Sequence, residues 1–226
     1  LTVGSRSLMQ PATWLVFQNT GTSHLVAISG LHLGLVAAVI YFIASFCWRI
    51  SPNLSLRIPA PRVAAIVAML AAVAYGTLAG FSVPTQRAVV MIFVLMCAEI
   101  FNYSAPIWRR LLLALLAVLI WMPFAIYSAS FWLSFAAVGS LLYGLQAKFE
   151  VNKVWQWLRM QWVIFLGLMP ITLYFFQKLS LIMFVSNLIA IPWVGMVIVP
   201  ICLLAAIAML FSSALSQWLF HLAGIL

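Results

Sequence analysis

Polar residues that could do chemistry gather at the start of the first long apolar run. The sequence GTSHLVAISGLHLG holds two histidines, two serines and three glycines. On a helix, His24, Ser29 and His32 fall within about one side, and Ser29 and His32 are one turn apart. Gly30 and Gly34 form a small-xxx-small pair, which lets a second helix approach closely. The pattern predicts either a tight helix crossing with hydrogen bonds across it or the polar mouth of a path through a membrane.

A serine and a histidine one turn apart raise the question of nucleophilic catalysis, in which the histidine base needs a group that orients it. The chain contains no Asp, and its two acids, Glu99 and Glu150, are expected toward the opposite membrane face. Two histidines without a nearby carboxylate or Cys rarely hold zinc. The sequence therefore predicts no catalytic residues, no metal site, no cofactor and no enzymatic activity for this chain.

Arg87 is the single charge in the connection GFSVPTQRA, next to an apolar run. A buried arginine in a membrane costs roughly 3 kcal/mol by insertion scales, so it should have a partner. One interpretation is that Arg87 reaches the lipid headgroups along its flexible stem. The other is that it meets a phosphate, because the planar guanidinium fork matches phosphate geometry.

The elements that must position these residues are membrane helices. Of the 226 residues, 67% are hydrophobic and 6% are charged, whereas ordinary globular domains carry roughly 25% charged residues. Lipid is the solvent that suits such a chain, and helices satisfy their backbone hydrogen bonds internally there. The composition predicts an all-α, polytopic transmembrane bundle with about seven or eight spans.

Six of the expected spans are ordinary apolar runs. They lie at about residues 25–48, 63–80, 88–103, 111–126, 131–147 and 155–176. The uncharged segment 181–211 is different, because a straight helix of that length would measure about 46 Å against a hydrocarbon core of about 30 Å. Pro192 and Pro200 each remove a helix hydrogen bond. We expect a broken or re-entrant piece up to about Pro192, with Asn187 and Pro192 as its lining residues, then a true span and a further helix.

The charges predict both the preferred substrate and the orientation. The net charge is +9, with 11 basic residues against two acids, and such a field suits an anion. Eight basic residues fall on one side of the predicted spans: Arg49, Arg57, Arg62, Arg109, Arg110, Lys148, Lys153 and Arg159. Three fall on the other side: Arg6, Arg87 and Lys178. Because basic loops stay in the cytoplasm, the sequence predicts an N-terminus on the outer side.

Four segments together resemble the competence domain of the ComEC family, the inner-membrane DNA channel of natural transformation. They are GTSHLVAISGLHLGLV, LAGFSVPTQRAVVM, SFWLSFAAVGSLL and SNLIAIPWV, in the family's order, and they cover most of the chain from about Gly21 to Val194. The chain departs from the resemblance at Trp132, where many members have Gln. The resemblance therefore implies no functional role for position 132.

The resemblance implies passage of single-stranded DNA across the cytoplasmic membrane, together with other competence proteins on both membrane faces. We expect His24, Ser29, Gly30, His32 and Arg87 at the outer entrance of the DNA path. The basic residues expected at the cytoplasmic face are Arg49, Arg62, Arg109, Arg110 and Lys148.

Two further expectations concern what surrounds this domain and what else it could do. Residues 1–20 are expected to connect to a periplasmic domain, and residues 21–226 to form the membrane domain, cut at its C-terminal end. Full-length members of the family often add an OB-like domain and a metallo-β-lactamase-like domain. The alternatives to a DNA channel are a secondary transporter for a small anion, with its site at the broken helix, and a membrane anchor for soluble domains.

Overall fold

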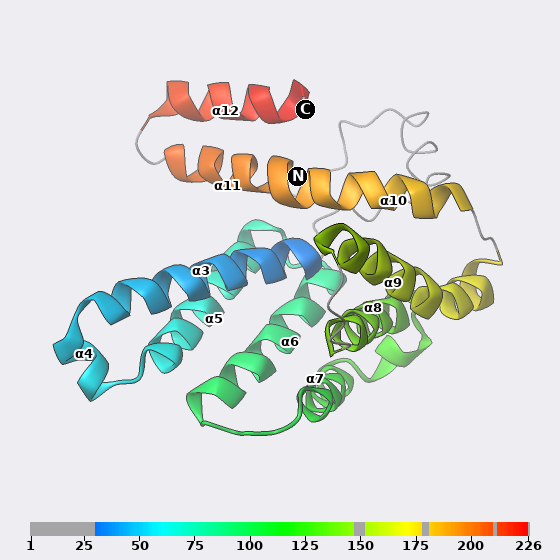
Figure 1. Cartoon of the computed structure of the whole chain (residues 1–226), viewed down its shortest axis with the longest axis horizontal. Coiled ribbons are helices and arrows are strands. Elements are labelled where there is room, and N and C mark those ends of the chain that lie inside the picture. The colour runs from blue at the N-terminus through cyan, green and yellow to red at the C-terminus, as the bar shows by residue number, and fades with distance from the viewer. Residues whose placement is uncertain (1–29, 147–151, 178–180, 210–211, 226) are drawn as a thin grey trace.

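The computed structural model describes residues 30–146, 152–177, 181–209 and 212–225, and these segments fold as helices and their connections (Figure 1). No strand occurs within the described ranges, so the predicted all-α class is confirmed. The elements are α3 (Gly30–Ile50), α4 (Pro52–Arg57), α5 (Ala60–Leu78), α6 (Val83–Ile100), α7 (Ile107–Trp121), the 3-10 turn η1 (Pro123–Tyr127), α8 (Ala129–Gln146), α9 (Lys153–Phe176), α10 (Leu181–Trp193), the π-helical stretch η2 (Val194–Ile198), α11 (Val199–Ala208) and α12 (Ser213–Ile225).

Helices α3, α5 and α6 form the most tightly packed part of the bundle. One face of α5 is built from small residues spaced four apart. They are Ala60, Ala64, Ala68, Ala72 and Gly76, and all are buried. Small side chains let helix backbones approach closely where lipid provides no hydrophobic driving force. This stripe holds the start of α3 near the start of α6, because Leu33 and Ala37 share a cluster with Ala88 and Ile92.

A second cluster joins α6 to α7 and α8. Ala114 and Val118 of α7 pack on Phe131 and Phe135 of α8, and partly buried residues of α6 complete the cluster. The Phe131 and Phe135 rings lie 5.0 Å apart between centroids. Aromatic pairs at this separation add stabilisation beyond area burial. The cluster fixes α8 against α6 and so determines which α8 residues can reach the α6 side chains.

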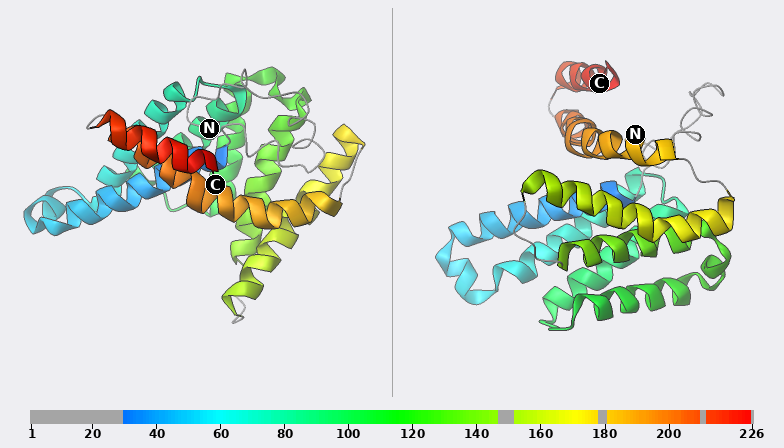
Figure 2. Two further views of the ribbon diagram at one scale, coloured as in Figure 1. Left: turned by 90° about the horizontal axis from the view of Figure 1, so that it is seen from above. Right: turned by 45° about the vertical axis from the view of Figure 1, so that its right-hand side comes forward.

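The segment predicted to be broken is interrupted at the expected place, but it is not a re-entrant hairpin. After Pro192 the backbone changes to the π stretch η2, and α11 follows with Pro200 as its second residue. Figures 1 and 2 show α10 and α11 end to end as one bent rod, with α12 folded back beside α11. Prolines lack the N–H for an α-helical bond, and a π stretch keeps the chain helical past that gap.

The predicted count of seven or eight spans stays a prediction. Four of the described helices are long and apolar enough to cross a membrane by themselves: α3, α5, α6 and the Val154–Phe176 part of α9. Helix α7 is 15 residues long, which is about 22 Å. It ends at Trp121 and not near residue 126 as expected, because Pro123 forces Met122 out of helical geometry, at φ −134° and ψ 78°.

Candidate functional site

The connection between α5 and α6 is a tight turn that sets the direction of Arg87. Gly80 has a φ of +74°, a conformation that costs glycine nothing. The Phe81 N–H donates to the Gly76 carbonyl at 3.0 Å, which closes the end of α5. Pro84 then stands in the first turn of α6, where its missing N–H is harmless. The turn GFSVP therefore fixes the start of α6 so that Arg87 faces the bundle.

Arg87 is enclosed by protein, with an exposed fraction of 1%. Its Nη2 donates to the Ser130 hydroxyl, and the Ser134 hydroxyl lies 3.5 Å from the same nitrogen. Both serines belong to α8, so the guanidinium bridges two helices. The first interpretation, in which Arg87 extends to the lipid headgroups, is therefore wrong in this structure.

The two serines are positioned by the way α8 begins. The Ser128 hydroxyl accepts a hydrogen bond from the Phe131 N–H at 3.2 Å, the arrangement of a helix N-cap. The Trp132 indole N–H donates to the Ile126 carbonyl at 2.8 Å and ties α8 to η1. Ser130 then lies in the first turn of α8 and Ser134 one turn further. Neither serine was among the predicted site residues, although two serines four residues apart at the start of an apolar helix are a signal that the sequence carries.

The surroundings of Arg87 are strongly positive. Its Nε and Nη1 are buried and have no hydrogen-bond partner among the described residues. Arg87 lies one turn into α6 and is bonded to the first turn of α8, and each helix start carries about half a positive charge. Glu99, the one acid within the described ranges, is twelve residues along α6, or about 18 Å. A buried cation whose Nε and Nη1 lack partners, with no carboxylate close by among the described residues, is a site that suits an anion.

The described part of the first-span motif packs against the start of α6. His32 is buried, with 2% of its surface exposed, and a Cβ added to Gly30 would lie 3.2 Å from the Ala88 Cβ. Gly34 has no such neighbour within 4 Å, so of the predicted glycine pair only Gly30 makes a close approach. His24 and Ser29 lie outside the described residues. His32 and Arg87 are thus enclosed between helices and do not line an open mouth.

The predicted lining of the broken helix is placed apart from Arg87. Asn187 and Pro192 lie in α10, whose main packing neighbours are α9 and η2. The Asn187 Oδ1 is buried and has no hydrogen-bond partner within the described part of the chain. The structure therefore places Gly30 against Ala88, the residue that follows Arg87, and it places Asn187 in α10.

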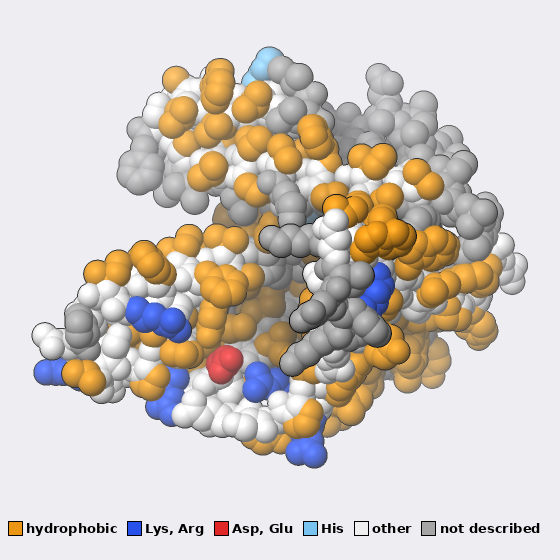
Figure 3. Space-filling model, in the orientation of Figure 1, with side chains coloured by type: hydrophobic (Ala, Val, Ile, Leu, Met, Phe, Trp, Pro, Cys, Tyr) orange, Lys and Arg blue, Asp and Glu red, His pale blue; other side chains and the backbone are white. Residues whose placement is uncertain are grey.

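The basic residues of the first and third connections gather at one end of the bundle. Arg49 and Arg57 flank α4, Arg62 lies in the first turn of α5, and Arg109 and Arg110 begin α7. Figure 3 shows Lys and Arg side chains in blue along this lower end, with the acidic side chain in red among them. Lys148 lies outside the described residues. The position of these residues at the cytoplasmic face stays a prediction.

Comparisons with known proteins agree with this architecture. Competence protein ComA of Neisseria gonorrhoeae is 35% identical over 216 residues, covering 92% of this chain and 30% of that protein. Recombination protein 2 of Haemophilus influenzae is 34% identical over 221 residues, covering 91% and 27%. ComE operon protein 3 of Bacillus subtilis is 28% identical over 201 residues, covering 88% and 25%. The chain thus spans about a quarter to a third of the length of these relatives.

No solved structure matches the chain. The family described as "Competence protein" matches residues 1–226, which is the whole sequence. Together with the apolar helices, this match makes the chain a membrane protein. The resemblance drawn from the four sequence segments is thereby confirmed, and the chain belongs to the Competence protein family.

Proposed function

We propose that this domain conducts single-stranded DNA across the cytoplasmic membrane during natural transformation, and that it acts with other competence proteins. The observation that carries the proposal is the buried Arg87, whose Nε and Nη1 have no partner among the described residues. A DNA phosphate would supply the missing negative charge, and the attraction between the two rises as the local dielectric falls. The relatives' names, which refer to competence and to recombination, support a polyanion over a small solute.

In this proposal the strand reaches Arg87 only when the bundle opens. The guanidinium is 1% exposed and is held by Ser130 and Ser134. Separation of the starts of α6 and α8 would free it, and Gly30 of α3 lies against the neighbouring Ala88. His32 is proposed to join this entrance. His24 and Ser29 are proposed to continue this entrance toward the outer face. The chain itself is proposed to be a conduit without catalytic activity.

A reconstituted system can test the function directly. With the protein in liposomes, we expect a labelled single-stranded oligonucleotide to enter and a duplex of the same length to stay outside. Protection of the label from an external nuclease measures entry. The small-anion transporter predicts phosphate or sulfate uptake without oligonucleotide entry, and the anchor predicts neither. Either of these two results would contradict the proposal.

The orientation of the chain is a separate prediction, and it follows from the charge difference between the two ends. Reporter fusions after Arg57 and Lys153 should report a cytoplasmic position, and fusions near Pro84 and Lys178 an external one. The reason is that translocating basic loops is disfavoured. Alkaline phosphatase and a fluorescent protein serve as complementary reporters. Swapped signals at these positions would show that the N-terminus faces the cytoplasm.

A further inference from the structure

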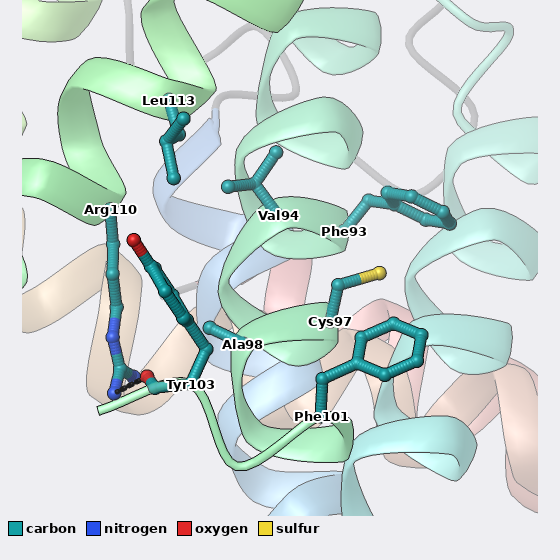
Figure 4. Close-up of a pocket in the computed structure, with 8 residues that line it drawn as sticks. All are labelled: Phe93, Val94, Cys97, Ala98, Phe101, Tyr103, Arg110 and Leu113. Carbon is teal, nitrogen blue, oxygen red and sulfur yellow. Dashed lines mark hydrogen bonds between the residues drawn. The ribbon is translucent and has the colours of Figure 1, made fainter. Parts of the chain in front are cut away.

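A groove opens between α6 and α7 (Figure 4). Its α6 lining residues lie toward the C-terminal end of that helix, whereas Arg87 lies near the start. Its cavity measures about 380 Å³ and is lined mainly by apolar side chains, among them Phe93, Val94, Cys97 and Leu113. A water molecule takes up about 30 Å³, and an apolar cavity of many times that size does not hold ordered water well. At membrane depth, the natural filling of such a groove is a hydrocarbon chain.

The mouth of this groove carries a cation in a defined position. Arg110 donates from Nε to the Ala105 carbonyl at 3.2 Å and from Nη2 to the Tyr103 carbonyl at 3.1 Å. These bonds fix the guanidinium plane against the loop that joins α6 to α7. Figure 4 shows the Tyr103 side chain between Arg110 and α6. Arg110 also lies in the first turn of α7, where the helix dipole favours an anion.

No carboxylate competes for Arg110 among the described residues of the groove. The hydrogen bonds of Arg110 go to backbone carbonyls. Arg109 is exposed beside the groove, so the end of the bundle keeps its positive charge.

We propose that this groove binds an anionic phospholipid, with one acyl chain between α6 and α7 and the headgroup phosphate on Arg110. The groove supplies both parts that such a lipid needs, an apolar slot at the end of a membrane span and a fixed guanidinium at its rim. Tyr103 has the amphipathic ring typical of the membrane interface. The site lies at the opposite end of α6 from Arg87, and it does not depend on DNA transport.

A photoactivatable phosphatidylglycerol with the reactive group on its acyl chain tests this site on the delipidated, purified protein. We expect crosslinks on Phe93, Cys97 and Leu113, and competition by unlabelled phosphatidylglycerol but not by phosphatidylcholine or inorganic phosphate. Arg110→Gln should lower labelling about tenfold, the effect of losing one charge-assisted hydrogen bond. Arg109→Gln is the matched control and should label like the wild type.

A second variant keeps the test decisive if Arg110→Gln disturbs the loop. Leu113 is 42% exposed, so Leu113→Trp fills the groove without replacing a core side chain. It should also lower labelling strongly, because the indole ring takes the space of the acyl chain. Wild-type labelling in both Arg110→Gln and Leu113→Trp would overturn the site. Equal competition by phosphatidylcholine would overturn recognition of an anionic headgroup, and competition by inorganic phosphate would overturn the lipid as the ligand.

Discussion

Replacing Arg87 by alanine is expected to lower transformation about 100-fold or more, while the protein remains in the membrane at a normal level. The reason for the loss is that two or more charge-assisted hydrogen bonds to phosphate disappear, each contributing about 1.5–3 kcal/mol. The reason for the normal level is that no buried charge is left behind. The Ser134 hydroxyl already donates to the Ser130 carbonyl at 2.7 Å, so it keeps a partner without Arg87. Transformation frequency at equal expression is the measurement.

Two variants separate the contact with phosphate from the structural bridge. Arg87→Lys keeps the charge but loses the bidentate fork, and it should retain part of the activity. Ser130→Ala removes the main α8 partner of the guanidinium and should leave most of the uptake. Arg109→Ala, an exposed arginine at the other end of the bundle, is the control for a general loss of positive charge. We expect little change in transformation from it.

The affinity of the purified variants for single-stranded DNA tests the same contact independently of their expression levels. If Arg87 meets one phosphate, Arg87→Lys and wild type should have similar salt dependence for single-stranded DNA. Arg87→Ala should lose about 0.7 from the slope of log affinity against log salt. Normal uptake and an unchanged slope in Arg87→Ala would show that Arg87 only bridges α6 and α8.

The sequence predicted the positions of most helices, because helix boundaries depend on the local residue types. Apolar runs of span length, with Pro and Gly between them, placed α3, α5, α6, α8 and α9 within five residues of their observed ends. Helix α7 was extended too far because hydropathy continues past Trp121, whereas Pro123 ends the helix on steric grounds. Chain direction after a proline is decided by local backbone geometry, which an apolar run does not reveal.

The candidate site could be predicted only in part, because packing between distant helices decides it. Arg87 was selected as a charge in an unusual place, and its proximity to the first-span motif followed from the topology. Its enclosure was not predictable, since it depends on where α8 packs against α6. Ser130 and Ser134 are more than forty residues from Arg87, so only the α6–α8 packing brings them to the guanidinium.

Replacing Gly30 by leucine is the second change with a large expected effect. A Cβ at position 30 already lies 3.2 Å from the Ala88 Cβ, which is tighter than normal packing, and leucine adds three further carbons. Overpacking of this kind costs about 1–3 kcal/mol. The added bulk would push the start of α3 away from α6 and from the neighbouring Arg87. We expect a clear fall in the thermal unfolding temperature and a strong loss of transformation.

The matched control lies one turn away on the same helix. Gly34 has no atom within 4 Å of an added Cβ, so Gly34→Leu should be tolerated and should gain about 1 kcal/mol of helix propensity. Both variants add the same side chain to the same apolar helix, so lipid solubility and expression are matched. Gly30→Leu combined with Ala88→Gly should recover part of the stability, because the second change removes the Cβ that the leucine meets. If Gly30→Leu and Gly34→Leu reduce stability and transformation equally, the close approach of α3 to α6 is not the reason that position 30 needs glycine.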